Sequence, residues 1–184
     1  MRITPTLLAL PLALAACSET VDAPSTLSAS AEASQNGTVC PQELRLELSD
    51  YLDADLPEMN DDFLTLNADR DGVITTASGL QYKVAQPALS DGVVPALDQQ
   101  VEVLYHGYYP DGEVFDSAYE RGVPISFAPN QVIAGWTEAL SDMGVCEARI
   151  LYIPGELAYG TGTPKQGGRP QGTLLFNVQN LGVQ

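Results

Sequence analysis

The sequence predicts an α+β domain in which an antiparallel β-sheet of about five strands is wrapped around one short amphipathic helix. From Ser78 onward, several short runs alternate apolar and polar side chains, which is the period of a strand with one buried face. Between these runs lies a single stretch whose apolar residues recur at helical spacing. We therefore expect the sheet to cover one face of that helix.

Three runs place their apolar residues on a single strand face, namely Leu80–Val84, Val101–Tyr105 and Leu174–Val178. A fourth run, Arg149–Ile153, is mostly apolar and is consistent with a central strand. Turn residues lie between the runs, at Asp91-Gly92 and Pro110-Asp111-Gly112.

The one helical pattern extends from Val132 to Met143. Trp136 and either Ala139 or Leu140 fall between these two residues at helical spacing. Asn130 is suited to cap the N-terminus of this helix, because its side chain can accept a hydrogen bond from a free backbone N–H.

The first 17 residues read as an export signal. Arg2 precedes an apolar stretch, Leu7–Ala16, that is shorter than the ~20 residues needed to span a bilayer. The run Leu14-Ala15-Ala16-Cys17 resembles the bacterial lipobox, whose cysteine becomes the lipidated first residue of the mature protein. We expect residues 1–17 to be a lipoprotein signal peptide ending at a lipidated Cys17, which would anchor the protein to a membrane. The alternative is a plain signal peptide beside a chance cysteine.

Residues 18–39 are rich in Ser, Ala, Thr and Glu, and we expect them to form a flexible tether. Residues 40–75 are expected to form a small N-terminal segment that is partly helical. Within it Leu44, Leu48, Tyr51 and Leu52 share a helical face, although Leu44, Leu46 and Leu48 also alternate as in a strand. Helix is preferred here, and the strand remains an alternative.

The run from Asn67 to Ser78 imitates the start of an EF-hand calcium loop. The twelfth position should be a bidentate Glu and is Ser78 instead. A strand pattern follows where an EF-hand needs a second helix, so we expect no calcium site.

The chain is acidic, with 24 Asp and Glu against 8 Lys and Arg. Such a surface repels phosphate backbones, and we therefore expect no nucleic acid partner. The charge otherwise fits solubility or a salty medium and does not identify a reaction.

Lipidation of Cys17 would leave Cys40 and Cys146 in a compartment where disulfides persist, and we expect them to form a bridge. The alternative is one exposed thiol and one buried one. Two distant cysteines and a lone His106 do not supply the spacing of a metal site, so we expect no metal. His106 alternates to the side of its strand opposite Tyr105, which predicts a place on the surface.

Five motifs together resemble the FKBP-type peptidyl-prolyl cis/trans isomerases, in order and at the spacing of that family. They are Val103–Gly107, Asp111–Ser117, Val132–Trp136, Leu157–Gly160 and Thr173–Phe176. The resemblance implies an FKBP-like isomerase domain over residues 76–184. The lead-in Gly72-Val73 and Ser78–Tyr82 is similar to the macrophage-infectivity-potentiator branch, which is exported in Gram-negative bacteria. That branch often has long N-terminal dimerisation helices, for which this chain has no room.

The resemblance also implies the site. Catalytic residues would be Tyr105, Phe115, Asp116, Trp136, Tyr159 and Phe176, with Trp136 as the floor of an apolar pocket. Val132, Ile133, Ile125 and Arg121 would bind substrate or pair with Asp116. The Ile133 backbone N–H and the Tyr159 hydroxyl would hold substrate carbonyls. Each aromatic alone would read as core packing.

The chain departs from the family before Thr173, where Gly167-Gly168-Arg169-Pro170 stands in place of an Ile followed by prolines. Ile125 stands where relatives often carry Phe. Because both changes remove apolar area at the mouth of the pocket, we expect macrolide inhibitors to bind weakly.

We therefore expect a peptidyl-prolyl isomerase without a cofactor, acting on proline-containing polypeptides and assisting protein folding in the cell envelope of a Gram-negative bacterium. Ser18 after the cysteine favours the outer membrane, facing the periplasm. The alternative is a non-catalytic chaperone or peptide-binding adaptor with the same fold.

Overall fold

A computed structural model describes residues 38–53, 55–57, 62–89, 92–161 and 170–184, all within one unit, Ala33–Gln184. The expected signal peptide, Cys17 and most of the expected tether lie outside the described residues. In the part that is described, no helix has the length and apolar character to cross a membrane.

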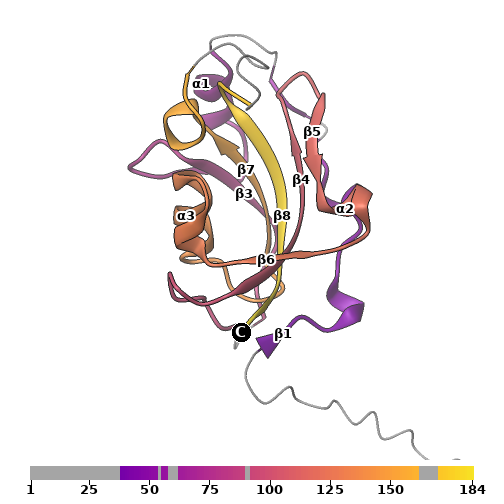
Figure 1. Cartoon of the computed structure of the whole chain (residues 1–184). Coiled ribbons are helices and arrows are strands. Elements are labelled where there is room, and N and C mark those ends of the chain that lie inside the picture. Colours follow the sequence, from indigo (N-terminus) through magenta and orange to yellow (C-terminus); the bar gives the residue numbers. More distant parts are fainter. Residues whose placement is uncertain (1–37, 54, 58–61, 90–91, 162–169) are drawn as a thin grey trace, which may run out of the picture. The chain divides into compact units, whose positions relative to one another are not determined.

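The strands in the described residues form one eight-stranded sheet. Its order is β2-β3-β7-β8-β4-β5, with β1 paired to β8 and β6 paired to β4 (Figure 1). Its longest strands are the ones predicted from sequence: β3 (Gln81–Gln86), β4 (Val101–Tyr108), β7 (Ala148–Ile153) and β8 (Leu174–Val183). The others are β1 (Thr38–Val39), β2 (Val73–Thr75), β5 (Val114–Ser117) and β6 (Ile125–Phe127). The expected count of about five was low because strands this short show too little alternation to be recognised.

The α-helices are α1 (Phe63–Ala68), α2 (Ala118–Arg121) and α3 (Ala134–Leu140). Helix α3 is the expected amphipathic helix, but it begins later than predicted, and Ile133 rather than Asn130 is its N-cap. Asn130 lies instead in a separate 3₁₀ turn, η3 (Pro129–Gln131). Val132 is extended between the turn and the helix, so the two cannot be continuous. Another 3₁₀ turn, η4 (Gly155–Leu157), follows β7.

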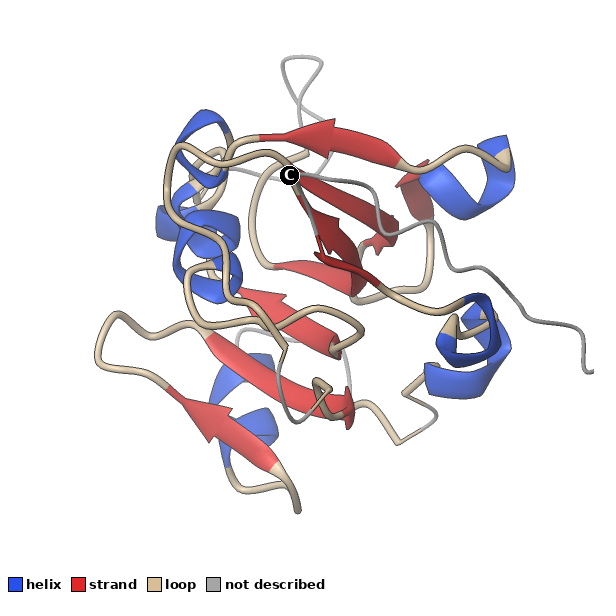
Figure 2. Ribbon diagram, turned by 90° about the horizontal axis from the view of Figure 1, so that it is seen from below, coloured by secondary structure: helices blue, strands red, loops and turns tan. Residues whose placement is uncertain are grey.

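One face of the sheet packs on α3 to form the main core (Figures 1 and 2). Alternate residues of the two central strands point into this core, including Leu151 and Ile153 of β7 and Phe176 and Val178 of β8. The intervening residues of β7 and β8 are buried as well. The second face of the sheet must therefore also be covered.

An N-terminal strap, defined here as residues 40–53 and 55–57, lies mainly on that second face. It contains the 3₁₀ turns η1 (Gln42–Leu44) and η2 (Leu48–Tyr51), so the helix preferred from sequence is only two short turns. The strap and α1 share a second apolar cluster with the sheet, which includes Tyr51, Phe63, Tyr152 and Leu175. Residues expected as a separate segment thus form a layer of the same unit.

Polar side chains fix the strap to the sheet at several points. Gln179 of β8 accepts from the Leu46 N–H and donates to the Leu44 carbonyl, both at 3.0 Å. Asp53 receives two hydrogen bonds from Arg70, of 2.6 and 2.8 Å, and one from the Tyr152 hydroxyl. Burial acts against the ionised form of Asp53, but these donors outweigh it and lower its pKa to about 2.

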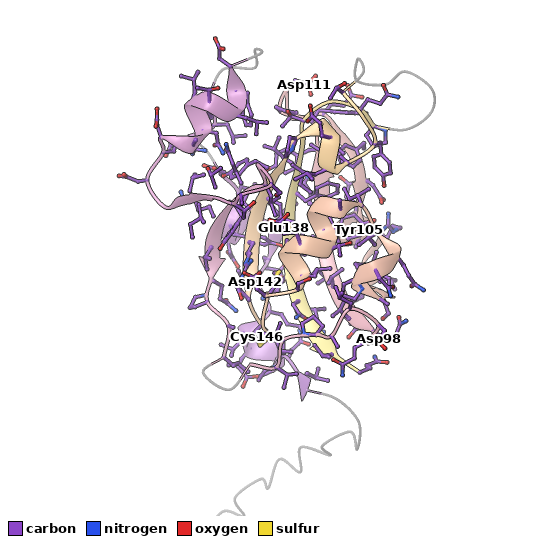
Figure 3. The ribbon with its side chains drawn as sticks, turned by 90° about the vertical axis from the view of Figure 1, so that its left-hand side faces the viewer. Asp98, Tyr105, Asp111, Glu138, Asp142 and Cys146 are labelled. Carbon is purple, nitrogen blue, oxygen red and sulfur yellow. A yellow bond between two sulfur atoms is a disulfide. The ribbon has the colours of Figure 1, made fainter. Side chains whose placement is uncertain are left out.

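Cys40 and Cys146 are joined by a disulfide, at an S–S distance of 2.11 Å. Both cysteines are buried, at 2% and 0% exposure. The bond links the start of the strap to the turn before β7, and Figure 3 marks Cys146 below α3. The alternative of one exposed thiol is therefore not what the structure contains.

The surface position predicted for His106 was wrong, because the side chain is 7% exposed. It points to the sheet face that the strap layer covers, where its Nδ1 lies 3.0 Å from the Ser117 hydroxyl. Burial lowers the pKa of His106, an effect that nearby Glu120 partly opposes. A face that alternation marks as outward need not be exposed when another layer covers it.

The run from Asn67, which imitates the start of an EF-hand loop, makes contacts that hold the fold together. The Asn67 side chain is fully buried, donates to Gln81 at 2.8 Å and accepts from Arg70 at 2.8 Å. The strand β3 follows it where an EF-hand would place a helix.

Candidate active site

A cavity of about 670 Å³ opens between β4, β5, β6, α3 and the turn after η4. It brings together every residue that the sequence predicted for the pocket except Arg121. Its lining is Tyr105, Phe115, Asp116, Ile125, Phe127, Gln131, Val132, Ile133, Trp136, Ala158, Tyr159, Pro170 and Phe176. Segments that are far apart in sequence therefore meet at one apolar hollow.

Trp136 is the centre of the aromatic lining. It lies in the first turn of α3 with its side chain 5% exposed, and α3 faces the viewer in Figure 3 with Tyr105 beside it. Tyr105 and Phe176 meet the indole nearly edge to face, at ring-centroid distances of 5.3 and 5.2 Å. Phe127 adds a tilted contact at 5.5 Å. These contacts fix the orientation of the indole and exclude water around it.

Gly107 lets β4 pass close beneath the rings of Phe115 and Phe176. A Cβ atom at this position would lie 2.8 Å from ring carbons of both Phe115 and Phe176. The two rings pack edge to face at 5.4 Å, and they could not do so above a larger residue. The glycine in the motif Val103–Gly107 is thus a packing requirement of the pocket wall.

Asp116 supplies the polar part of the wall, from the edge strand β5. Its carboxylate accepts hydrogen bonds from the Tyr105 hydroxyl and from Arg121. Arg121 also donates to the Tyr105 oxygen at 2.9 Å and lies over its ring, 5.6 Å from the centroid. Burial alone would raise the pKa of Asp116, but the donors Tyr105 and Arg121 hold it below its ordinary value. The carboxylate is therefore ionised at neutral pH.

Arg121 lies outside the cavity lining and contacts it through Asp116 and Tyr105. It is the last residue of α2, which begins at its N-cap Ser117 and ends at Gly122 in the left-handed conformation, with φ of 67°. The Ser117 side chain accepts from the Glu120 N–H at 3.1 Å. Since glycine adopts a positive φ without strain, the helix can end directly after Arg121 and the chain can turn toward β6.

The two expected holders of substrate carbonyls both lie at the cavity. Ile133 is the N-cap of α3, and the N–H of an N-cap residue is not part of the ladder of hydrogen bonds inside the helix. Tyr159 follows η4 and is 41% exposed, as a group at the mouth of a pocket would be. Their roles as holders stay predictions.

Sequence reasoning missed four lining residues: Phe127, Gln131, Ala158 and Pro170. Phe127 had a signal, because it is two residues from Ile125 and must share its strand face. Gln131 and Ala158 belong to irregular backbone, where no periodicity identifies a lining position. Most of the loop that departs from the family, residues 162–169, lies outside the described residues.

Comparison with known proteins gives two family matches. Residues 92–181 match the model described as FKBP-type peptidyl-prolyl cis-trans isomerase. Residues 10–84 match the model described as the domain amino terminal to FKBP-type peptidyl-prolyl isomerase. Together they include both the cavity and the strap.

Two curated relatives and one solved structure illustrate the similarity. "Peptidyl-prolyl cis-trans isomerase Mip" of Coxiella burnetii is 44% identical over 123 residues, 66% of this chain and 52% of the relative. "Outer membrane protein MIP" of Legionella longbeachae is 39% identical over 127 residues, 67% of this chain and 52% of the relative. The crystal structure of a peptidyl-prolyl cis-trans isomerase from Pseudomonas syringae is 30% identical, with a TM-score of 0.58 over 66% of this chain and 87% of that chain. The chain spans about half the length of the curated relatives it matches.

Proposed function

The chain belongs to the family of FKBP-type peptidyl-prolyl cis-trans isomerases, and from this premise we propose that it catalyses rotation about Xaa-Pro bonds in polypeptides of the cell envelope. The observation that carries the proposal is the aromatic cavity centred on Trp136, with the Asp116–Tyr105–Arg121 group in its wall. Assistance to protein folding follows from this activity.

The chemistry needs no covalent step and no cofactor. The barrier to rotation is roughly 18–20 kcal/mol because resonance keeps the amide planar. Twisting the bond localises the nitrogen lone pair and makes the amide less polar than in the ground state. A dry aromatic pocket therefore favours the twisted amide over the planar one.

Each group has an expected role in this rotation. The proline ring would lie against Trp136 between Tyr105 and Phe176, and the Ile133 N–H and the Tyr159 hydroxyl would hold substrate carbonyls. Asp116 would fix Tyr105 and Arg121 at the wall. Val132 and Ile125 would contact the residues that flank the proline.

A proline-peptide isomerisation assay on the soluble chain tests the proposal. We expect a rate above the uncatalysed reaction across several Xaa-Pro peptides. The competing function is a non-catalytic chaperone or peptide-binding adaptor. A folded wild-type protein that binds such peptides without accelerating isomerisation would establish that alternative.

Replacing Asp116 with asparagine should lower kcat/KM about 3- to 10-fold, because a charge-assisted hydrogen bond is worth ~1.5–3 kcal/mol and this one is discounted for its exposure to solvent. The lowered pKa means that the ionised pair is present above the ordinary value of 3.8 and is lost only as the pH falls below it. Wild-type kcat/KM should thus be flat between about pH 5 and 8.

The matched control for Asp116→Asn is Glu120→Gln, which removes the same charge from the exposed face of α2. The control should keep wild-type kcat/KM. An equal loss in both variants would show that general charge rather than the pair with Tyr105 and Arg121 matters.

The protein is further proposed to be anchored by lipid at Cys17 in the outer membrane, facing the periplasm. The support is the lipobox-like run before Cys17 and Ser18 after it. The intact mass of the mature protein should show loss of residues 1–16 and added acyl chains. An unmodified N-terminus in the periplasmic fraction would contradict the anchor.

Macrolide inhibitors are proposed to bind this pocket weakly. Ile125 lines the cavity at a position where the family resemblance implies a Phe, and Pro170 is the described lining residue of the loop that departs from the family. A macrolide covers more of the mouth than a short peptide does, so it should lose more contact area.

A further inference from the structure

The segment from Asp116 to Arg121 lies between the pocket and the strap. Asp116 and Arg121 are directed to the pocket, where they pair with each other and with Tyr105. Ser117 and Tyr119 are directed to the other layer, where Ser117 contacts His106 and Tyr119 contacts the strap. The same short helix therefore has one face in the site and one face in the strap layer.

Tyr119 is held by a chain of hydrogen bonds from the strap. Its hydroxyl donates to the Leu46 carbonyl at 3.4 Å, which leaves its oxygen to accept from the hydroxyl of Tyr51. The two rings are also in contact, with centroids 6.2 Å apart. Burial raises the pKa of Tyr119 to about 12, so the hydroxyl keeps its proton across neutral pH.

The strap is fixed on either side of this contact. Before Tyr51, the backbone at Leu44 and Leu46 is bound to Gln179, and Cys40 is bound to Cys146. After Tyr51, the Asp53 carboxylate is bound to Arg70 and Tyr152. Tyr51 itself is 4% exposed, so it offers Tyr119 a partner with little freedom to move.

Helix α2 needs such support, because its four residues form a single turn that is not stable alone. The Arg121–Asp116 pair does not supply it, since both side chains are about half exposed, at 46% and 45%, and exposed ion pairs contribute little. The direction of Arg121 then depends on its contacts with Tyr105 and on contacts elsewhere on α2.

We infer that Tyr119 is a positioning residue for the isomerase site, held by Tyr51 of the strap so that α2 presents Arg121 to Asp116 and Tyr105. The strap thereby helps to position the residues of the site, in addition to covering the second face of the sheet. The inference rests on the proposed isomerase function for its effect on rate, but not for its effect on Asp116.

The test compares Tyr119→Phe, Tyr51→Phe and the double variant with the wild type. Phenylalanine keeps the ring packing and removes only the hydroxyl, so the fold should survive. Each single variant should lower kcat/KM about threefold, the loss expected when one hydrogen bond no longer orients the pair. The double variant should resemble Tyr119→Phe, because both changes break the same chain of hydrogen bonds.

A second readout separates positioning from stability. Carboxyl-carbon NMR should show the pKa of Asp116 rising toward its ordinary value in Tyr119→Phe, because a misdirected Arg121 no longer stabilises the carboxylate. The matched control is Tyr108→Phe, which removes from β4 a buried hydroxyl that donates to Asn177 at 3.1 Å and does not anchor the strap. It should lower the melting temperature and leave kcat/KM and the Asp116 pKa unchanged.

Two results would overturn the inference. One is a Tyr119→Phe protein that is less stable than the wild type yet has the wild-type kcat/KM and Asp116 pKa. The other is an equal change in Tyr108→Phe, which would mean that the loss of any buried hydroxyl near the sheet acts the same way. If the wild type shows no isomerase activity, the proposed function fails, while the Asp116 titration still decides whether Tyr119 positions the pair.

Discussion

Replacing Trp136 with alanine is expected to lower kcat/KM by roughly 10- to 100-fold, because the proline ring would lose an apolar contact worth ~1.5–3 kcal/mol. The same change should lower the free energy of unfolding by about 3 kcal/mol, near the low end for removing a large aromatic, since one face of the indole lines an open cavity. Isomerisation kinetics and urea unfolding measure the two effects.

Two variants separate the pocket effect from the stability effect. Trp136→Phe should recover most of both losses, because it restores an aromatic surface between Tyr105 and Phe176. Phe63→Ala removes a buried ring from the opposite face of the sheet, and it should lose stability but keep kcat/KM while folded. A Trp136→Ala protein with the wild-type kcat/KM would remove the indole from the mechanism.

Loss of the Cys40–Cys146 disulfide is expected to lower the free energy of unfolding by about 4–5 kcal/mol. The bond closes a loop with a sequence separation of 106 residues, and in the chain-entropy model long loops give the largest effect. For a unit of this size the melting temperature should fall by roughly 8–20 °C. Urea unfolding of the Cys40→Ala/Cys146→Ala variant measures the change.

The reduced wild type is the natural comparison for this variant. Dithiothreitol should lower wild-type stability to that of the double alanine variant and leave the variant itself unaffected. Peptide mapping without reductant should recover residues 40 and 146 in one linked fragment. Two alkylatable thiols in protein from an oxidising compartment would contradict the bond.

Much of the sheet and of helix α3 could be predicted from sequence, and the strap that covers the second face of the sheet could not. Strands β3, β4 and β8 were predicted because one face of each carries apolar residues at alternate positions, and β7 was predicted from a mostly apolar run. Gln179 on the other face of β8 reads as solvent-facing, but it binds the backbone of the strap. A polar residue that binds buried backbone and one that faces water look the same in a sequence.

The site also divides into residues that could be predicted from sequence and contacts that could not. Its aromatic residues could be identified because they belong to motifs at fixed spacing, and the structure brings them to one cavity. The contact of Tyr51 with Tyr119 joins residues 68 positions apart, and no periodicity predicts such a pair. Sequence reasoning therefore identified most of the cavity lining and missed the contact between the strap and α2 behind it.

The pairing of β1 with β8 has a consequence for the order in which the chain can assemble. Thr38 and Val39 lie opposite Val183 and Gly182, and the Cys40 N–H donates to the Leu181 carbonyl. A ribosome makes residues 38–53 long before β8, and their docking surface is complete only after residues 174–183 have been added. Until then the strap lacks its partner strand β8, and contacts between residues this distant in sequence form slowly. The growing chain thus keeps its earliest described residues available to chaperones or proteases for longer than any other part of the fold.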